Sequence, residues 1–579
     1  MRKLLLALSV IILPSAVFGQ LTDNEIIRYR DLQHPVLGAS GMVAAQNRMS
    51  AEAGAQVLAA GGNAVDAAIA TGFSLAVTLP RAGNLGGGGF MLIHDAGSGE
   101  NIAIDYREIA PQGATRDMYL DENGEVDRNR IRFSHLAAGV PGTVAGFYAA
   151  HQKFGHLPWK RLLQPAIAQA RDGIVVSHDM SELLKVWQKS LCKEEAACGY
   201  YFKKGGVPYE AGDLFVQSDL AGTLQLIADQ GADAFYRGKI AEQIIAEMQH
   251  GGGLIDAPSL AAYQPVVRSA VRGTYRGYDI LSMPPPSSGG VHLLQMLNIL
   301  EHFPVAELGA GSADNVHLLA EVARLAYADR SKHLGDPDFY EVPVNWLTSK
   351  AYGRELAATI DLKTARKSAD IAPGVVLLLE SNDTTHFSVI DENGDVVSNT
   401  YTLNFPFGSG IAVAGAGFLL NNEMDDFAAQ PDAPNAYGLL GGDANSVVAG
   451  KRPLSSMTPT IVFADGKPWF ATGSMGGSRI ITTVLQIIVN MIDHSMNLAE
   501  ATAAPRMHHQ WYPDVLQLES GFSPDTIRLL KQRGHVVQDA RYSMGSSQSV
   551  GFSGGVFRGA SDSRRPNAGS VAPHRPATR

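Results

Sequence analysis

Two short runs of β-branched and aromatic residues stand out in the pattern of hydrophobic and polar positions. They occupy residues 385–390 and 396–402, and Asn393-Gly394 lies between them. Asn-Gly is typical of a two-residue hairpin turn, because both central positions of that turn need positive φ. The pattern therefore predicts a β-hairpin over these residues.

Thr384, just before this hairpin, could act as a nucleophile if the chain were cut on its N-terminal side. The two-residue turn places Thr385 opposite Thr402, so Thr384 is a diagonal neighbour of Thr402, about 5–8 Å away. A cut between Asp383 and Thr384 would supply the α-amine of the same residue as the base that a threonine hydroxyl needs. On pattern alone, the start of an ordinary half-buried strand remains the simpler interpretation.

A second hairpin is predicted from Pro459 to Thr472, around Asp465-Gly466. It leads to Gly476-Gly477, which is followed by apolar residues at helical spacing between Ile481 and Ile492. The glycine pair therefore lies at a helix N-terminus, whose first N–H groups lack partners within the helix. Such donors suit an oxyanion hole, and a tight strand-to-helix turn is the structural alternative. Strands and helices mixed in this way indicate layered α+β packing.

Earlier parts of the chain indicate packing rather than chemistry. Small residues within 42–80 predict two closely packed helices, the first ended by Gly61-Gly62 and the second capped by Asn63. The tetraglycine within 85–91 lacks a following Gly-Lys-Ser/Thr, so we expect close backbone approach at a sheet edge and not a phosphate loop. Residues 140–335 have the pattern of a scaffold.

Composition and charge narrow the class of protein. The 579 residues are 45% hydrophobic and 18% charged, which is typical of a globular chain with a large core. The net charge of −10 argues against a nucleic-acid-binding surface. After Asp562 the chain is basic and proline-rich, which predicts a disordered tail at about 563–579.

Residues 1–19 have the features of a signal peptide. Arg2 and Lys3 precede an apolar run that is too short to span a bilayer, and small residues follow at 17–19. An uncleaved anchor is the alternative. Because no later segment resembles a membrane helix, we expect a periplasmic or secreted protein that is free of the membrane once the signal is removed.

The chain contains only two cysteines, Cys192 and Cys198. In an oxidising compartment they could form a local disulfide, and two free thiols are the alternative. A metal pair would need further ligands, which the neighbouring sequence does not offer. We therefore do not expect a metal at the cysteines.

Five motifs in one order resemble the γ-glutamyltransferase family of N-terminal-nucleophile hydrolases. The resemblance extends from about Gly38 to Asp562 and rests on DTTHFSVID, NTYTLN, NNEMDDF, KRPLSSMTPT and GSMGGSRI. It implies a four-layer αββα sandwich and self-cleavage into a large chain, 20–383, and a small chain, 384–579. Two departures are Met475, where the family has proline, and an apolar run at 375–379, where the family is polar.

The resemblance also implies a site for a carboxylate. Arg107, in DYRE, resembles the arginine that holds the substrate α-carboxylate, and a guanidinium can do so with two parallel hydrogen bonds. Ser455 and Ser456 resemble the paired serines that support the same group. From spacing alone, Arg107 would instead pair with Asp105 or Glu108.

Other residues are assigned by resemblance to the opposite end of the substrate. Asn404, Glu423 and Asp426 resemble the group that binds the α-ammonium, which is the charge that carboxylates would complement. Without the resemblance, the acidic residues would be a solvated loop. Tyr437, in a glycine- and proline-rich stretch, resembles the family's lid loop.

These assignments imply a two-stage transfer of a γ-glutamyl group from glutathione. Thr384 would attack the γ-carbonyl, and Thr402 would orient Thr384 for this attack. The N–H groups of Gly476 and Gly477 would hold the oxyanion. The acyl group would then pass to water or to an amino acid or peptide, and this mechanism implies no metal or organic cofactor. We expect His386 to be a packed or hydrogen-bonded strand histidine rather than the base. Three alternatives are a related acylase, a poly-γ-glutamate transpeptidase and an uncleaved binding protein.

Overall fold

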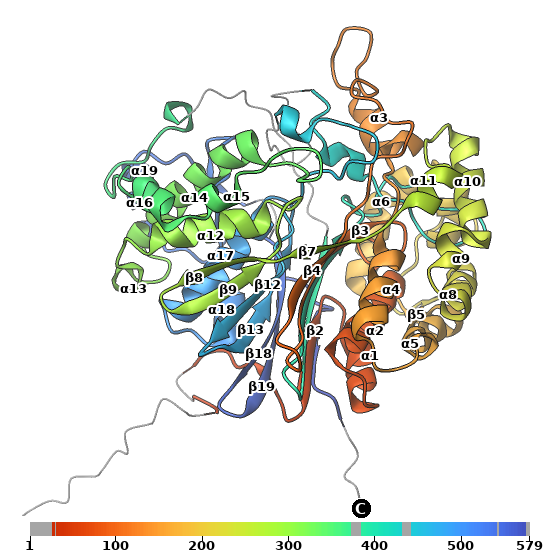
Figure 1. The fold of residues 1–579 in the computed structure, drawn as a ribbon, viewed down its shortest axis with the longest axis horizontal. Coiled ribbons are helices and arrows are strands. Elements are labelled where there is room, and N and C mark those ends of the chain that lie inside the picture. The colour runs from red at the N-terminus through yellow and green to blue at the C-terminus, as the bar shows by residue number, and fades with distance from the viewer. Residues whose placement is uncertain (1–25, 29–30, 372–383, 431–441, 541–542, 575–579) are drawn as a thin grey trace, which may run out of the picture.

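Two stacked antiparallel sheets lie between two layers of helices (Figure 1). The computed structural model describes residues 26–28, 31–371, 384–430, 442–540 and 543–574. One hydrophobic core lies between the first sheet and its helices, and a second fills the space between the two sheets and under the other helices. The predicted αββα sandwich is therefore confirmed.

The first sheet has the predicted hairpin at its centre. Phe387 and Val389 pack toward the helices, whereas Ser388 faces the second sheet and donates to the Gln548 carbonyl at 2.9 Å. Strand alternation thus gives the hairpin one apolar face and one polar face between the sheets. The strand order is β20 (Gly569–Val571), β2 (Gly41–Ala45), β10 (Thr385–Asp391), β11 (Val396–Thr402), β3 (Gly88–His94), β4 (Asn101–Tyr106) and β7 (Val266–Ser269).

The register of this hairpin differs from the prediction by one residue. Thr385 pairs with Tyr401, so Thr384 lies directly opposite Thr402 instead of diagonally. The loop has three residues rather than two, because the Asp391 side chain accepts hydrogen bonds from the N–H groups of Asn393 and Asp395. Only the last loop position, a glycine with φ 92°, has positive φ, as in a type I turn followed by a bulge.

The second sheet contains the second predicted hairpin, which is confirmed. Asp465 and Gly466 have φ of 50° and 74°, as a two-residue turn requires. A short strand, β14 (Ser474–Met475), also pairs with β18. The main order is β1 (Val36–Gly38), β19 (Val556–Ser561), β18 (Ser546–Ser553), β13 (Lys467–Thr472), β12 (Thr460–Ala464), β9 (Tyr278–Ser282) and β8 (Val271–Tyr275).

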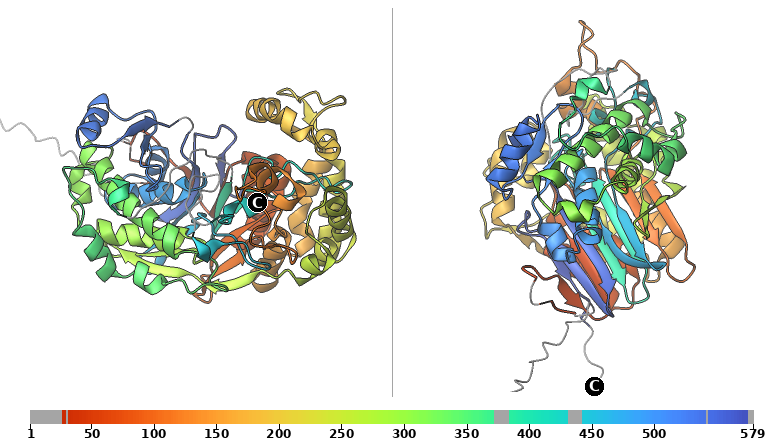
Figure 2. Two further views of the ribbon diagram at one scale, coloured as in Figure 1. Left: turned by 90° about the horizontal axis from the view of Figure 1, so that it is seen from above. Right: turned by 90° about the vertical axis from the view of Figure 1, so that its left-hand side faces the viewer.

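Early and late parts of the chain are interleaved in both sheets. In the first sheet, β10 and β11 lie between β2 and β3. In the second sheet, the four strands from β19 to β12 are flanked by β1 on one side and β9 on the other. Figure 2 shows red and orange strands beside cyan and blue ones. Neither half of the chain therefore forms a complete sheet by itself.

Helices cover both outer faces of the sandwich. Asn63 caps the second of the two predicted small-residue helices through a capping box with Asp66, as expected. On the side of the first sheet lie α1 (Arg48–Ala59), α2 (Ala64–Thr78), α4 (Thr143–Phe154), α5 (Trp159–Asp172), α8 (Ser218–Gln230) and α10 (Lys239–Gly251). On the opposite side lie α12 (Gly289–Leu300), α14 (Ala313–His333), α16 (Lys350–Ala357), α17 (Arg479–Ile492), α18 (Leu498–Ala503) and α19 (Pro524–Gln532).

Two predictions about loops need correction. The tail predicted to be disordered is ordered over 563–574, because β20 gains hydrogen bonds by pairing with β2. The tetraglycine does allow close backbone approach, since a Cβ on Gly89 would lie 2.4 Å from the Thr400 carbonyl oxygen. However, it leads into β3 between β11 and β4, in the interior of the sheet rather than at its edge.

The two cysteines are joined, as one of the alternatives expected. The Cys192–Cys198 disulfide links the end of α6 (His178–Leu191) to α7 (Glu195–Tyr201). Among the described residues, no helix combines the length and the apolar character needed to cross a membrane. The predicted signal peptide, 1–19, lies outside the described residues.

Candidate active site

A small cavity at the open end of the first hairpin brings most of the predicted site residues together. Pairing within the hairpin positions Thr384 and Thr402, Arg107 follows β4, and the loop before α17 closes the cavity. Its lining comprises Arg107, Arg330, Thr384, Thr402, Asn404, Glu423, Asp426, Leu454, Ser455, Ser456, Met457, Gly477 and Ile480.

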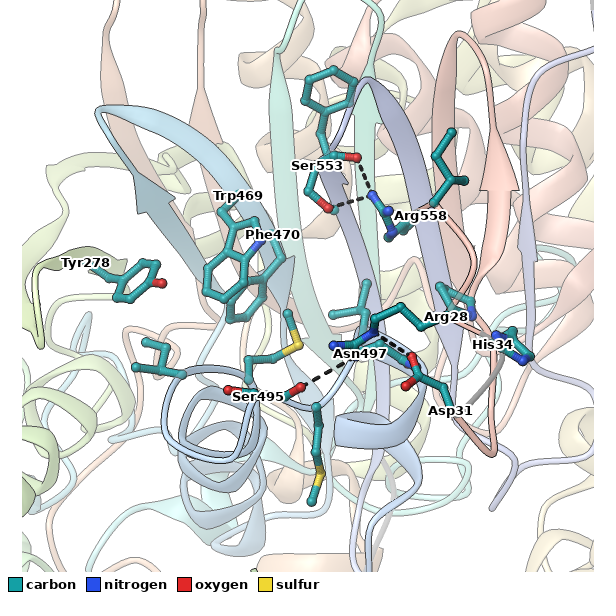
Figure 3. Close-up of a pocket in the computed structure, with 18 residues that line it drawn as sticks. Arg28, Asp31, His34, Tyr278, Trp469, Phe470, Ser495, Asn497, Ser553 and Arg558 are labelled. Atoms are coloured by element: carbon teal, nitrogen blue, oxygen red, sulfur yellow. Dashed lines mark hydrogen bonds and ion pairs between the residues drawn. The ribbon is translucent and has the colours of Figure 1, made fainter. Parts of the chain in front are cut away.

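A larger cavity, of about 440 Å³, lies elsewhere (Figure 3). Arg28 and Arg558 line one part of it, and the stacked rings of Tyr278 and Trp469 line another. None of the predicted site residues lines this cavity. Volume therefore does not identify the chemical centre, and the convergence of reactive groups does.

Thr384 and Thr402 form the reactive end of the small cavity. Their hydroxyl oxygens are 3.3 Å apart, and both residues are buried. The Thr402 hydroxyl oxygen also accepts a hydrogen bond from the N–H of Asn404 at 2.8 Å. Asn404 adopts a positive φ of 74°, which asparagine tolerates better than most residues. The strand end thus fixes Thr402 directly beside the proposed nucleophile.

His386 is a packed and hydrogen-bonded strand histidine, as expected. Its Nδ1 lies 2.8 Å from the Thr400 hydroxyl, and its Nε2 lies 2.9 Å from that of Ser388. Burial lowers the pKa of His386 to about 3, so the ring is neutral at physiological pH. Both ring nitrogens already have partners, which leaves neither of them for Thr384.

Arg107 lies in a buried cluster of opposite charges. One Nη contacts a Glu423 carboxylate oxygen, and the other is 2.5 Å from Asp426 Oδ2. Although burial alone would lower it, these carboxylates hold the pKa of Arg107 above its ordinary value. Burial raises the pKa of Glu423 and raises that of Glu108 to about 7. The guanidinium and the carboxylates predicted to hold opposite ends of a zwitterion therefore face each other.

The expectation from spacing, that Arg107 pairs with Asp105 or Glu108, is wrong for its main contacts. Asp105 pairs instead with Arg268 at 2.8 Å, and Glu108 is 3.8 Å from Arg107. The carboxylates that Arg107 contacts closely come from a 3-10 turn, η3 (Glu423–Asp426), more than three hundred positions later in the chain. Local spacing could not reveal this pairing.

Ser455 and Ser456 lie against a loop that precedes α12. Ser288 donates from both its N–H and its hydroxyl to the Ser455 carbonyl, each at 2.8 Å. The Ser456 hydroxyl accepts a hydrogen bond from Arg330 at 3.2 Å. Arg330 was missed by the sequence prediction, which assigned residues 140–335 to the scaffold. The available signal was a helical arginine with no acidic residue three or four positions away.

Gly476 and Gly477 lie immediately before α17, whose N-cap is Ser478. Their φ values of 127° and 57° belong to backbone that favours glycine. In the described part of the chain, neither N–H donates a hydrogen bond to another protein group. Gly477 lines the same cavity as Thr384, which places this backbone close to the proposed nucleophile.

Three sequence predictions concern residues outside the described ranges. They are Asp383 at the cleavage point, the apolar run at 375–379, and Tyr437 with most of its loop. The roles assigned to Asp383 and Tyr437 stay predictions. Met475, the departure from the family's proline, is buried in β14 and accepts a hydrogen bond from Gln46.

An αββα sandwich with a threonine at the start of a central strand defines an N-terminal-nucleophile hydrolase. Residues 50–572 match the family model described as Gamma-glutamyltranspeptidase. The chain therefore belongs to the γ-glutamyltranspeptidase family.

Individual relatives agree with this placement. The chain is 53% identical over 536 residues to the glutathione hydrolase proenzyme of Escherichia coli K12, covering 92% of each chain. It is similar in fold to a cephalosporin acylase from Bacillus halodurans, with a TM-score of 0.83 and 26% identity. The match covers 95% of this chain and 99% of the acylase. It also resembles a chain of Helicobacter pylori γ-glutamyltranspeptidase, with a TM-score of 0.56 and 45% identity. That match covers 61% of this chain and 99% of the other.

Proposed function

We propose that this chain is a self-cleaving γ-glutamyltransferase and glutathione hydrolase. One observation carries the proposal: the Thr384 hydroxyl, the Gly477 backbone and the charges around Arg107 line a single cavity. These are the parts that acyl transfer from a zwitterionic donor needs: a nucleophile, an oxyanion donor and complementary charges. The similarity to the E. coli glutathione hydrolase proenzyme supports the same function.

Maturation begins with two cuts. The signal peptide, 1–19, is removed on export to the periplasm or beyond, and self-cleavage between Asp383 and Thr384 follows. The products are a large chain, 20–383, and a small chain, 384–579, held as a heterodimer by the interleaved sheets. Cleavage frees the Thr384 α-amine. An unperturbed α-amine has a pKa of about 7.7–8.0, so such a group can serve as the base near neutral pH.

Turnover then has two acyl-transfer steps. Thr384 Oγ attacks the γ-carbonyl of glutathione while its own amine takes the proton, and the N–H groups of Gly476 and Gly477 stabilise the oxyanion. Cysteinylglycine departs with a proton from the Thr384 ammonium. A γ-glutamyl ester on Thr384 remains. Water, an amino acid or a peptide attacks this ester and restores the hydroxyl. Thr402 orients Thr384 throughout.

The charged cluster selects the glutamyl head. Arg107, with Ser455 and Ser456, binds the α-carboxylate, and Asn404, Glu423 and Asp426 bind the α-ammonium. On entry, each charge of the zwitterion replaces part of the contact between Arg107 and the carboxylates. A donor with a carboxylate but no ammonium would draw Arg107 away from Glu423 and Asp426 and give these carboxylates no new partner. Leaving buried carboxylates unpaired is costly.

This difference separates the proposed function from that of a glutaryl acylase. We expect kcat/KM for γ-glutamyl-p-nitroanilide to exceed that for glutaryl-p-nitroanilide by about 10⁴ or more, since unpaired buried polar groups discriminate strongly. Steady-state kinetics with both donors on the purified, cleaved protein measures the ratio. Similar kcat/KM on the two donors would refute the transferase and support the acylase.

Two substitutions assign the ends of the site. Asp426→Ala should reduce the ratio mainly by weakening the γ-glutamyl donor, because only that donor has an ammonium. Arg107→Ala should weaken both donors, because both have a carboxylate. If Asp426→Ala weakened both donors equally, the assignment of Asp426 to the ammonium would be wrong.

A further inference from the structure

Arg330 lies in the last turn of α14 and lines the small cavity together with Thr384. The residue is 4% exposed. Its Nε donates to the Ser288 hydroxyl at 2.9 Å, and one Nη donates to the Ser456 hydroxyl at 3.2 Å. Both partners are neutral. The guanidinium is thus firmly held by groups that do not neutralise it.

Several other buried arginines of the described chain have a carboxylate beside them. Arg107 is 2.5 Å from Asp426, Arg506 is 2.6 Å from Asp562, and Arg324, on the same helix, is 3.2 Å from Asp514. Within the described ranges, Arg330 has no carboxylate at ion-pair distance. Burial lowers the pKa of Arg330 to about 10, which leaves it charged at neutral pH. The Asp426 carboxylate acts on Arg330 only from beyond ion-pair distance. A buried cation with no carboxylate in direct contact is costly, so a bound anion would be stabilised here.

The hydrogen-bond directions around Ser456 show where that anion would bind. A guanidinium can only donate, so the Ser456 hydroxyl oxygen must act as the acceptor in its contact with Arg330. The hydroxyl proton then points elsewhere, and in the described part of the chain it is donated to no protein acceptor. An oxygen of an anion in the cavity could accept it. Ser288 works in the same way and donates its proton to the Ser455 carbonyl.

We propose that Arg330 is a specificity-determining residue for donors that carry an α-carboxylate. It positions Ser456 as a hydrogen-bond donor and adds a second positive charge to the cavity that Arg107 lines. This inference rests on the proposed function and deepens it, because it names a residue that recognises one end of the glutamyl head. Arg330 acts through Ser456 and through its charge, and it takes no part in bond making.

The test compares two donors that differ only in the carboxylate, γ-glutamyl-p-nitroanilide and 4-aminobutanoyl-p-nitroanilide. In Arg330→Met, we expect KM for the γ-glutamyl donor to rise by about 10- to 100-fold, the usual effect of losing a hydrogen bond to a charged group. The kcat on this donor and the kcat/KM on 4-aminobutanoyl-p-nitroanilide should change little. Arg330→Lys should restore part of the loss, because it keeps the charge.

Arg324→Met is the matched control, since Arg324 is a buried arginine of the same helix that does not line the cavity. It should lower the melting temperature and leave the ratio of the two donors unchanged. If Arg330→Met does not mature into two chains, Arg330→Gln decides in the same way, because it keeps an amide donor but no charge.

Three results would overturn the inference about Arg330. They are an equal loss on both donors, a loss in kcat alone, and no recovery in Arg330→Lys. Failure of the proposed function would look different, because the unmodified protein would then show no preference for γ-glutamyl-p-nitroanilide over glutaryl-p-nitroanilide.

Discussion

Both maturation and turnover depend on the Thr384 hydroxyl in the proposed mechanism. It can use an α-amine as its base only after its peptide bond is cut. We expect Thr384→Ala to remain one inactive chain, whereas the unmodified protein runs as two bands on a denaturing gel. Mass spectrometry should show that the smaller chain begins at Thr384. Normal cleavage in Thr384→Ala would exclude Thr384 as the nucleophile, and an uncut unmodified protein would favour the binding-protein alternative.

Thr402 should affect rates and leave the fold intact. Its hydroxyl lies 3.3 Å from that of Thr384 and is fixed by the Asn404 N–H. Losing this contact in Thr402→Ala should cost on the order of 1 kcal/mol or more in each barrier. Cleavage rate and kcat would therefore fall about fivefold or more, while Thr402→Ser should stay close to the unmodified protein. If cleavage and kcat in Thr402→Ala match the unmodified protein, the orienting role is wrong.

At the scale of elements, local patterns in the sequence were enough to predict the two hairpins, the capped helix at Asn63 and layered α+β packing, whereas the αββα order of the layers came from the family resemblance. The register of the first hairpin was missed for a local reason, because the Asp391 side chain extends the turn. The other misses depend on contacts between distant parts of the chain. The tail after Asp562 forms a strand only because β2 offers it an edge. Arg330 belongs to the site only because α14 ends beside Ser456.

One further residue of α14 holds the loop that forms the proposed oxyanion hole. The buried Tyr327 hydroxyl donates to the carbonyl of Ser478, the residue after Gly477. Tyr327→Phe would leave this carbonyl without its partner, at a cost of about 1–3 kcal/mol, and loosen the loop. We expect kcat to fall about tenfold on γ-glutamyl-p-nitroanilide, with little change in KM. A change confined to KM would show that Tyr327 acts on substrate binding instead.

For the whole molecule, buried histidines determine how stability depends on pH. Burial lowers the pKa of these side chains from 6.5 to about 3 or 4, so the unfolded chain binds more protons between these values and stability is lost as pH falls through about 6.5. Buried acids with a pKa raised to about 6 or 7 oppose this trend, but they are fewer than the histidines with a pKa of about 3 or 4. The histidines are His292, His386, His508, His509 and His535, and the acids are Glu108, Asp391 and Asp425.

We therefore expect the free energy of unfolding to decrease by on the order of 1–2 kcal/mol per pH unit between pH 7 and pH 5. Calorimetry at a fixed scan rate and ionic strength would record this as a falling melting temperature. A melting temperature that rises toward pH 5 would mean that the acids dominate.

Because the two sheets are interleaved, the order of folding and cleavage matters. While the chain is continuous, β10 and β11 are tethered to β2 and β3 on either side of them, so they pair with these strands at a high effective concentration. After a cut before Thr384, the same strands belong to a separate polypeptide, and recovery from unfolding requires two chains to meet. Refolding of the cleaved protein should thus depend on dilution, whereas refolding of Thr384→Ala should not. The chain must fold before it cuts itself, and each cleaved molecule then keeps a fold that it cannot easily rebuild.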